Sequence, residues 1–371
     1  MKKSLFYFLT IIFLLIVTGC SADSTANTKE TTQEGTIKMI DDLGKTIMMP
    51  EPAGRIISLY SAHTENLFSL GLDDQVIGVY KTDSYPPGAT TKDVFDYRSD
   101  PEKVIAVNPD MVLIRPFINE SHPDFVKALE NAGINVVCLY PDQFEDFGPY
   151  IKKLAKLTGR EKEAEKLLYN FNRELNDIAS VAGKIKHKKQ VFFESTEREY
   201  RTITNDCMAA NAIRISGGIN IASDAVPVRK GSSIASYGLE RILDRAGDID
   251  VYVAQRGAMN SGVNPDAIRT RPGFNTIKAV KENRIYTIDE KLVSSPTFRY
   301  ATGVRKLAGF LYPEIRNTLD ERVEKLNESK TDLPNASSFT CSGLVRSKYS
   351  YCQTTVGGNR TGSPGRISLY W

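Results

Sequence analysis

Two stretches of the chain follow one pattern: EKVIAVNPDMVLI at residues 102–114 and ERILDRAGDIDVYV at residues 240–253. Each begins with a glutamate and a basic neighbour, and each has an aspartate eight residues after that glutamate, just before an apolar strand. Arg115 and Arg256 follow the carboxyl ends of these two predicted strands. Coincidence is one explanation, because the helix dipole favours glutamate in a first turn anyway. The other is that the chain has two halves built on one local plan.

The segments around both stretches alternate between strand-like and helix-like runs. We expect strands at residues 55–60, 76–80, 111–114, 135–140, 190–193, 251–254 and 284–288, where the runs are apolar and short. We expect helices at residues 64–70, 102–107, 124–132, 207–215 and 301–311. Strands that alternate with helices favour parallel sheets that carry helices on both faces.

A long segment separates the two halves. Neither Gly nor Pro occurs between Gly159 and Gly183, and Leu168, Phe171 and Leu175 recur at helical spacing. At 1.5 Å per residue such a helix spans about 35 Å, which suits a rigid connector between two lobes better than a surface helix. Two lobes and a stiff connector predict a cleft with little closure. Because ligands in α/β sheets sit beyond the carboxyl ends of the strands, Arg115 and Arg256 are expected there, on opposite lobes.

The N-terminus has the layout of a secretory signal. Two lysines are followed by an uncharged run at residues 4–17 and then by Thr18-Gly19-Cys20. The run is shorter than the roughly 20 residues that a transmembrane helix needs. Val17-Thr18-Gly19-Cys20 resembles a bacterial lipobox, which implies a signal peptide at residues 1–19 and lipidation of Cys20; an ordinary signal peptide is the alternative. Residues 20–37 are rich in Ser, Thr and Glu and are interpreted as a flexible tether.

Composition excludes several classes of function. The net charge is +3 without a long basic block, which argues against nucleic-acid binding. The three histidines, His63, His122 and His187, are scattered, which argues against a histidine-built metal site. P-loop, GxGxxG, HExxH, GxSxG and CxxC motifs do not occur. Cys138 lies in an apolar run and is expected to be a buried thiol.

Six segments carry a family resemblance. They are RIISLYSAHTENLFSLG (55–71), DSYPP (83–87), the PE and NPDMV runs within 101–112, SGGIN (216–220), the stretch 271–286, and Ser295-Pro296. Together they resemble ABC-transporter solute-binding proteins of the iron-siderophore and cobalamin type, over about residues 55–313. The resemblance implies an α/β fold with two Rossmann-like lobes joined by a single long α-helix, the class III solute-binding architecture.

The resemblance also implies a function and partners. Such proteins bind a metal chelate between the lobes and deliver it to a permease, which works with an ATPase subunit. One glutamate on each lobe engages permease arginines, and the matching positions here are Glu102 and Glu240; ordinary acids at helix N-termini are the alternative interpretation. We expect a monomer without a cofactor or a resident metal, anchored through Cys20 on the extracytoplasmic face of the cell membrane.

Candidate ligand-binding residues follow strands or lie beside the matching segments. An anionic chelate would be met by arginine charge and tyrosine rings, although each candidate could also be a solvated arginine or a half-buried tyrosine. The candidates are Tyr60, Tyr85, Tyr97, Arg98, Arg115, Tyr200, Arg201, Arg256, Met259 and Arg299. His63 is interpreted as a capping or surface residue; a position facing the cleft is the alternative.

The domain boundaries follow from these assignments. We expect an N-terminal lobe at residues 38–150, the connecting helix at 151–187 and a C-terminal lobe at 188–318. Residues 319–371 form an atypical tail, since its last 39 residues contain neither Asp nor Glu; we interpret it as disordered or as the product of a shifted reading frame.

The sequence therefore predicts an importer component for a ferric siderophore or a similar iron chelate. Cobalamin or another corrinoid is the nearest alternative ligand, and heme is the next. A secreted enzyme that uses the cleft is a remote alternative, because no nucleophile–base pair or metal triad supports it. A structural surface lipoprotein is a further alternative, but it would need neither a cleft nor paired acids.

Overall fold

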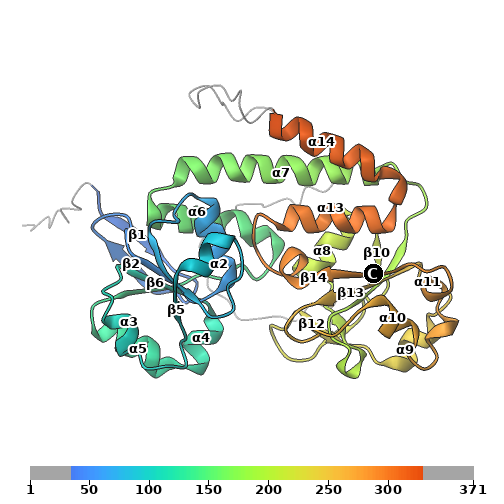
Figure 1. The fold of residues 1–371 in the computed structure, drawn as a ribbon, viewed down its shortest axis with the longest axis horizontal. Helices are drawn as coiled ribbons and strands as arrows, with labels where there is room; N and C mark the ends of the chain where they lie inside the picture. The colour runs from blue at the N-terminus through green and yellow to red at the C-terminus, as the bar shows by residue number, and fades with distance from the viewer. Residues whose placement is uncertain (1–34, 329–371) are drawn as a thin grey trace, which may run out of the picture. The chain divides into compact units, whose positions relative to one another are not determined.

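The computed structural model describes residues 35–328, and the core of its N-terminal lobe is a five-stranded parallel sheet (Figure 1). The strands, in the spatial order β5-β4-β3-β6-β7, are β5 (Asp93–Phe95), β4 (Val76–Tyr80), β3 (Ile56–Ser58), β6 (Met111–Ile114) and β7 (Asn135–Cys138). All four residues of β6 are buried, as expected of a strand that is covered on both faces. Cys138 at the end of β7 is buried, which confirms its prediction as an internal thiol.

Helices connect these strands and cover the sheet. They are α2 (Ser61–Ser69), η1 (Pro87–Thr91), α3 (Glu102–Ile105), α4 (Pro116–Ser121) and α5 (Pro123–Asn131). An antiparallel hairpin of β1 (Ile37–Ile40) and β2 (Thr46–Met49) precedes the sheet. This hairpin is not among the strands predicted from the sequence, and β1 begins at the last residue assigned to the tether.

The long helix predicted from the sequence is present as α7 (Glu161–Gly183). It does not start at residue 151, because η2 (Phe144–Asp146) and α6 (Phe147–Thr158) form separate helices before it. Gly159 ends α6 in a left-handed conformation, with a φ of 65°, which glycine adopts without the strain of a side chain. Figure 1 shows α7 extending alongside both lobes.

The C-terminal lobe has a second parallel sheet. Its strands, in the order β10-β8-β13-β14, are β10 (Ile219–Asn220), β8 (Gln190–Glu194), β13 (Val251–Arg256) and β14 (Ile285–Asp289). A small antiparallel sheet adds β11 (Val226–Pro227), β12 (Ile234–Ser236) and β9 (Thr202–Ile203). The helices of this lobe are η3 (Arg198–Tyr200), α8 (Met208–Ile215), α9 (Leu239–Asp244), α10 (Pro265–Arg269), η4 (Phe274–Thr276), α11 (Lys278–Lys281), α12 (Glu290–Val293) and α13 (Tyr300–Leu311). Two α/β lobes and one long connecting helix confirm the predicted fold class.

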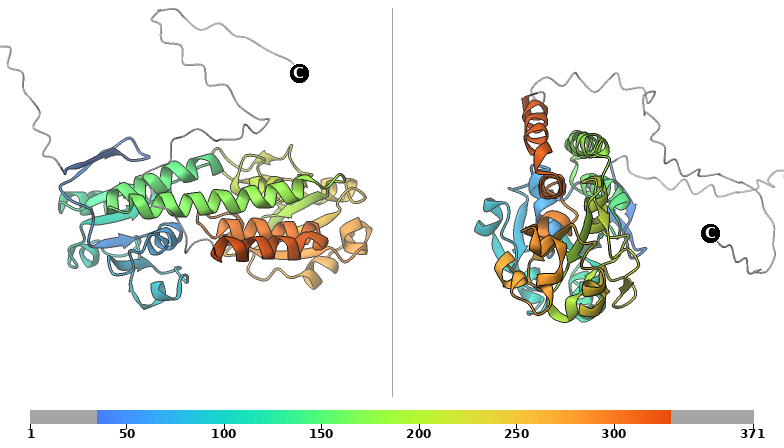
Figure 2. Two further views of the ribbon diagram at one scale, coloured as in Figure 1. Left: turned by 90° about the horizontal axis from the view of Figure 1, so that it is seen from above. Right: turned by 90° about the vertical axis from the view of Figure 1, so that its right-hand side faces the viewer.

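Aromatic packing on α7 joins the two halves. The Phe171 ring of α7 lies 4.9 Å from the ring of Phe147 on α6 and 5.8 Å from that of Phe298, just before α13. Figure 2 shows α7 and α13 extending alongside each other. The hydrophobic core that surrounds α7 therefore takes side chains from both lobes.

The last described helix corrects the predicted start of the tail. After η5 (Pro313–Ile315), helix α14 (Arg316–Glu328) continues past residue 319. Leu319 is buried, and the guanidinium of Arg322 pairs with Asp177 of α7 at 3.2 Å. Residues 319–328 are thus helical, because apolar and charged positions of α14 contact the lobe. The rest of the predicted tail lies outside the described residues, as does the signal segment with Cys20.

Candidate functional site: the cleft between the lobes

The carboxyl ends of strands from both sheets supply the walls of two adjoining cavities. The larger cavity has a volume of about 470 Å³ and the smaller about 270 Å³. Both are lined by Tyr60 and Arg115 of the N-terminal lobe and by Glu290 and Ser295 of the C-terminal lobe. The cleft therefore lies where the strand topology predicts a ligand site.

The N-terminal lobe contributes an aromatic wall. Tyr80 ends β4, and its ring stacks on that of Tyr97 at a centroid distance of 5.1 Å. Tyr60 follows β3, and its ring lies 6.0 Å from that of Tyr140, which follows β7. Burial is the main reason that the pKa values of Tyr60 and Tyr80 lie above the ordinary value, so both phenols are neutral at pH 7. This wall offers flat apolar faces and neutral hydroxyl groups.

Arg115 places a cation on the same wall. It follows β6, it is half-buried, and its guanidinium lies 5.1 Å from the ring centroids of Tyr60 and Phe117. Among residues 35–328, no carboxylate forms an ion pair with Arg115. Its positive charge is thus held by cation–π contacts and is available to a ligand.

His63 supports this wall from inside the lobe. Its side chain is fully buried; its Nδ1 lies 2.8 Å from the Tyr150 hydroxyl and its Nε2 3.1 Å from the Ile114 carbonyl oxygen. Burial lowers the pKa of His63 to about 4, so the imidazole is neutral. The interpretation of His63 as a capping or surface residue was therefore wrong: the ring lies under Tyr60, at a centroid distance of 5.1 Å.

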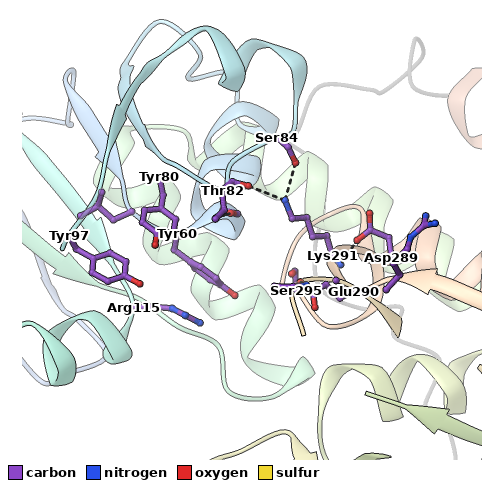
Figure 3. A pocket seen from close by; sticks show the side chains of 15 residues that line it. Tyr60, Tyr80, Thr82, Ser84, Tyr97, Arg115, Asp289, Glu290, Lys291 and Ser295 are labelled. Carbon is purple, nitrogen blue, oxygen red and sulfur yellow. Dashed lines mark hydrogen bonds between the residues drawn. The ribbon is translucent and has the colours of Figure 1, made fainter. Parts of the chain in front are cut away.

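The C-terminal lobe contributes a charged wall (Figure 3). Arg256 ends β13, Asp289 ends β14, and Glu290 and Lys291 open α12; all four line the larger cavity. Arg256 is among the residues predicted from the sequence, whereas Asp289, Glu290 and Lys291 are not. The rule that located Arg256, the carboxyl end of a parallel strand, also applies to the residues that follow β14.

A buried network fixes the loop that follows Arg256. Glu194, at the end of β8, is fully buried and accepts hydrogen bonds from the Tyr252 hydroxyl at 2.5 Å and from Asn260 Nδ2 at 3.0 Å. It also forms an ion pair with buried Arg271. Because the charge of Glu194 is paired and hydrogen-bonded, the carboxylate is stable inside the lobe and holds the loop that carries Met259.

Two of the predicted ligand residues, Tyr85 and Arg299, contact one another. The Arg299 guanidinium lies 3.8 Å from the ring centroid of Tyr85 and donates two hydrogen bonds, of 2.8 Å and 2.5 Å, to the carboxylate of Glu65. Glu65 belongs to α2 in the N-terminal lobe, whereas Arg299 precedes α13 in the C-terminal lobe. The Arg299 charge is thus already paired, across the two lobes.

The remaining candidates are distributed more widely. Tyr97 lines the larger cavity and Met259 the smaller one. Exposed Arg98 has its guanidinium 5.3 Å from the ring centroid of Tyr97, at the edge of the aromatic wall. Tyr200 packs on Phe274, and Arg201 pairs with Glu199 at 2.6 Å. The candidates that line neither of the two cavities are Tyr85, Arg98, Tyr200, Arg201 and Arg299.

Glu102 and Glu240 are both exposed in the first turn of a short helix. Helix α3 carries Glu102 on the N-terminal lobe, and α9 carries Glu240 on the C-terminal lobe. Figure 1 shows both helices on the side of their lobes that is remote from α7. The two acids are therefore presented on opposite lobes.

Two features of the described residues concern metals and membranes. Within residues 35–328, no three His, Cys, Asp or Glu side chains are grouped closely enough to hold a metal ion. Among the same residues, none of the helices combines the length and the apolar content needed to cross a bilayer. The cleft thus offers tyrosine, arginine, lysine and carboxylate groups to a ligand.

Known proteins share this architecture. An uncharacterized ABC transporter substrate-binding lipoprotein of Bacillus subtilis, YvrC, is 28% identical over 82% of this chain and 95% of its own length. A vitamin B12-binding protein of Vibrio campbellii is 24% identical over 69% of this chain and 88% of its own. The crystal structure of a possible iron-binding (periplasmic solute-binding) protein from Staphylococcus epidermidis is 27% identical and aligns with a TM-score of 0.62, over 71% of this chain and all of that one.

The family relationship covers both lobes. The profile of the periplasmic binding protein family matches residues 56–292, from β3 in the first sheet to α12 at the cleft. The matched region includes Arg115, Arg256 and the long helix α7. The chain belongs to the periplasmic binding protein family.

Proposed function

We propose that this chain is the substrate-binding component of an ABC importer, and that it captures a ferric siderophore or a similar iron chelate in the cleft between its lobes. The observation that carries this proposal is the unpaired charge of Arg115 on the tyrosine wall shared by both cavities. An anionic chelate gains charge-assisted hydrogen bonds from such an arginine and flat contact from the rings. The binding chemistry needs no nucleophile and no metal bound by the protein itself.

A corrinoid is the second candidate ligand. The Vibrio campbellii relative is named a vitamin B12-binding protein, and the four tyrosines of the aromatic wall would suit a large ring as well as a catecholate. A corrinoid would depend less on Arg115 and more on these tyrosines. Heme is the third candidate; burial raises the pKa of Tyr60, so this phenol would have to lose its proton on binding to act as a tyrosinate ligand of the iron.

Delivery to the membrane completes the proposal. Glu102 and Glu240 are the proposed contacts with permease arginines, since two exposed charges on separate lobes set the orientation of docking. Lipidation of Cys20 is the proposed anchor, because acyl chains hold a protein at a bilayer without a spanning helix. The protein would act as a monomer at the extracytoplasmic face and would pass its ligand on to the permease and ATPase subunits.

A ligand panel tests the proposed class. The full chain with Cys20→Ser would be titrated with a ferric tris-catecholate, a ferric hydroxamate, hemin and cyanocobalamin, with thermal shift and visible absorbance as readouts. We expect one iron chelate to bind with one-to-one stoichiometry. After release, the chelate should be chemically unmodified. Binding of cyanocobalamin alone would favour the corrinoid, and chemical turnover of a panel member would favour the enzyme alternative.

A further inference from the structure

Lys291 connects the two lobes beside the larger cavity. Its Nζ donates hydrogen bonds to the Thr82 carbonyl oxygen at 3.3 Å and to Ser84 Oγ at 3.0 Å (Figure 3). Lys291 belongs to α12 of the C-terminal lobe, whereas Thr82 and Ser84 follow β4 of the N-terminal lobe. All three residues line the larger cavity. We propose that this contact, the lysine bridge, closes one side of the cleft over the ligand and limits the size of the ligand that is retained.

The C-terminal lobe holds the base of the bridge in place. Asp289 Oδ1 accepts a hydrogen bond from the backbone N–H of Lys291 at 2.9 Å. The carboxylate of Glu290 occupies the space beside Gly257 that a Cβ would need, and it accepts the N–H of Ala258 at 3.2 Å. These contacts fix the first turn of α12. The backbone position from which the Lys291 side chain extends is therefore fixed as well.

The N-terminal lobe holds the acceptors equally well. Asp83 stands between Thr82 and Ser84, and its carboxylate accepts hydrogen bonds from Ser61 Oγ and Thr64 Oγ1, both at 2.5 Å. Because Ser61 and Thr64 belong to α2, the loop after β4 moves with that helix. The two ends of the lysine bridge are thus each attached to a separate lobe, and its length reports the separation of the lobes.

The bridge is weaker than the buried polar contacts that also join the lobes. Its acceptors are a neutral carbonyl and a neutral hydroxyl, and Lys291 is only half-buried, so water competes for its ammonium group. By contrast, buried Glu65 holds Arg299 through two hydrogen bonds, and the neighbouring Asn66 donates to the Pro296 carbonyl oxygen at 2.8 Å. We infer that the lobes pivot at these buried contacts while the lysine bridge opens and closes.

The size limit follows from the closed geometry. With the bridge formed, the larger cavity of about 470 Å³ lies within the range of sites for drug-sized ligands. A bulkier ligand displaces Lys291 from Thr82 and Ser84 and loses the free energy of the bridge. Lys291 therefore acts on specificity by favouring compact chelates. This size limit rests on the proposed function, whereas the bridge itself does not.

The first test needs no ligand. Spin labels would be placed at Asp124→Cys and Lys281→Cys, two exposed positions on separate lobes, in the full chain with Cys20, Cys341 and Cys352 changed to Ser. We expect Lys291→Met to shift the distribution of label distances to longer values. Lys291→Arg, which keeps a donor, and Lys152→Met, the same charge change at an exposed site on α6, should match the unsubstituted chain. A Lys291→Met distribution identical to that of the unsubstituted chain would overturn the bridge.

The second test addresses size selection. The affinities of a ferric tris-catecholate and of the larger cyanocobalamin would be measured for the unsubstituted chain and for Lys291→Met. We expect the preference for the compact chelate to fall about fivefold, the effect of one hydrogen bond. An unchanged preference for the compact chelate would show that Lys291 does not limit the size of the ligand. If neither probe binds either protein, the proposed function fails, while the label distances still decide whether the bridge exists.

Discussion

Arg115 and His63 lie close together but in opposite electrostatic states. The guanidinium of Arg115 keeps its charge at the cleft because the ring faces of Tyr60 and Phe117 support it. The imidazole of His63 is neutral because burial opposes the cation, and it serves as a hydrogen-bonded spacer between Tyr150 and Ile114. A charged His63 would add a second cation to Arg115 without a counterion, so its neutrality preserves the site.

The neutral state of His63 makes stability depend on pH. Its pKa is about 4 in the folded protein and about 6.5 when unfolded, so between these values the unfolded chain binds a proton that the folded chain does not. The free energy of unfolding should therefore fall as the pH is lowered from 6.5 towards 4, by up to about 1.4 kcal/mol per pH unit from this residue. Above pH 7.5 this contribution should be constant.

Urea unfolding of the unsubstituted chain and of His63→Gln at pH 7.5, 6.0 and 5.0 measures this effect. Carboxyl groups with raised pKa values, such as Asp83, are common to both proteins and cancel in the difference. We expect the stability advantage of the unsubstituted chain to be largest at pH 7.5 and to shrink towards pH 5.0. An advantage that stays constant over this range would contradict a neutral, buried His63.

At the scale of secondary structure, the sequence predicted the elements that have strong patterns. Met111–Ile114 and Val76–Tyr80 are strands with the expected bounds, and α7 occupies the stretch without internal Gly or Pro, although the connecting helix was expected to continue to residue 187. Local patterns failed where tertiary contacts decide. Helix α14 was missed because it is highly polar, and only contacts such as buried Leu319 and the Arg322–Asp177 pair fix it against the lobe.

The candidate site was also predictable only in part, namely where its residues follow the ends of strands. The strand-end rule located Tyr60, Arg115 and Arg256, which line the larger cavity. It could not foresee that Arg299 would be paired, because its partner Glu65 is distant in the sequence. Nor could it identify Lys291, whose relevance depends on the distance between two lobes and not on any local pattern.

Helix α7 should contribute to stability through its aromatic contacts. Phe171 is buried among rings from both lobes, so Phe171→Ala should lower the free energy of unfolding by about 3–5 kcal/mol. Tyr169→Ala, on the exposed side of the same helix, should change it by less than about 0.5 kcal/mol. Urea unfolding of both variants is the measurement. Equal effects of the two substitutions would contradict the role of Phe171 as a joint between the lobes.

At the scale of the whole molecule, three features act on the relation between the lobes. Helix α7 extends along both, the Glu65–Arg299 pair joins them through a buried carboxylate, and the lysine bridge joins them beside the larger cavity. The buried pair is expensive to separate, because a lone buried charge is strongly unfavourable. These features favour a cleft that opens only slightly; the small closure expected from the stiff connector stays a prediction, which scattering profiles of the free and the loaded protein would test.

The proposed docking to a permease involves Glu102 and Glu240, on the outer surfaces of the two lobes. Glu102→Ala and Glu240→Ala should each weaken the apparent affinity for the reconstituted permease at least about tenfold, because each removes one partner of the ion pair proposed with a permease arginine. The readout is ligand-stimulated ATP hydrolysis. Asp124→Ala, another exposed acid in a first helical turn, should have no effect. Loss of ligand binding by Glu102→Ala or Glu240→Ala would show that these residues act on the cleft and not on docking.

The central claim is that one anionic ligand is held between the lobes by a cation from each. The most direct test is the dissociation constant of the iron chelate selected by the ligand panel, measured by calorimetry for Arg115→Gln, Arg256→Gln and Arg173→Gln. Arg173 is exposed on α7 and serves as the control. We expect each cleft substitution to raise the dissociation constant at least about tenfold, as loss of one charge-assisted hydrogen bond does, and the control to leave it unchanged. Binding that is insensitive to both cleft substitutions, or the absence of binding by every chelate, would contradict the claim.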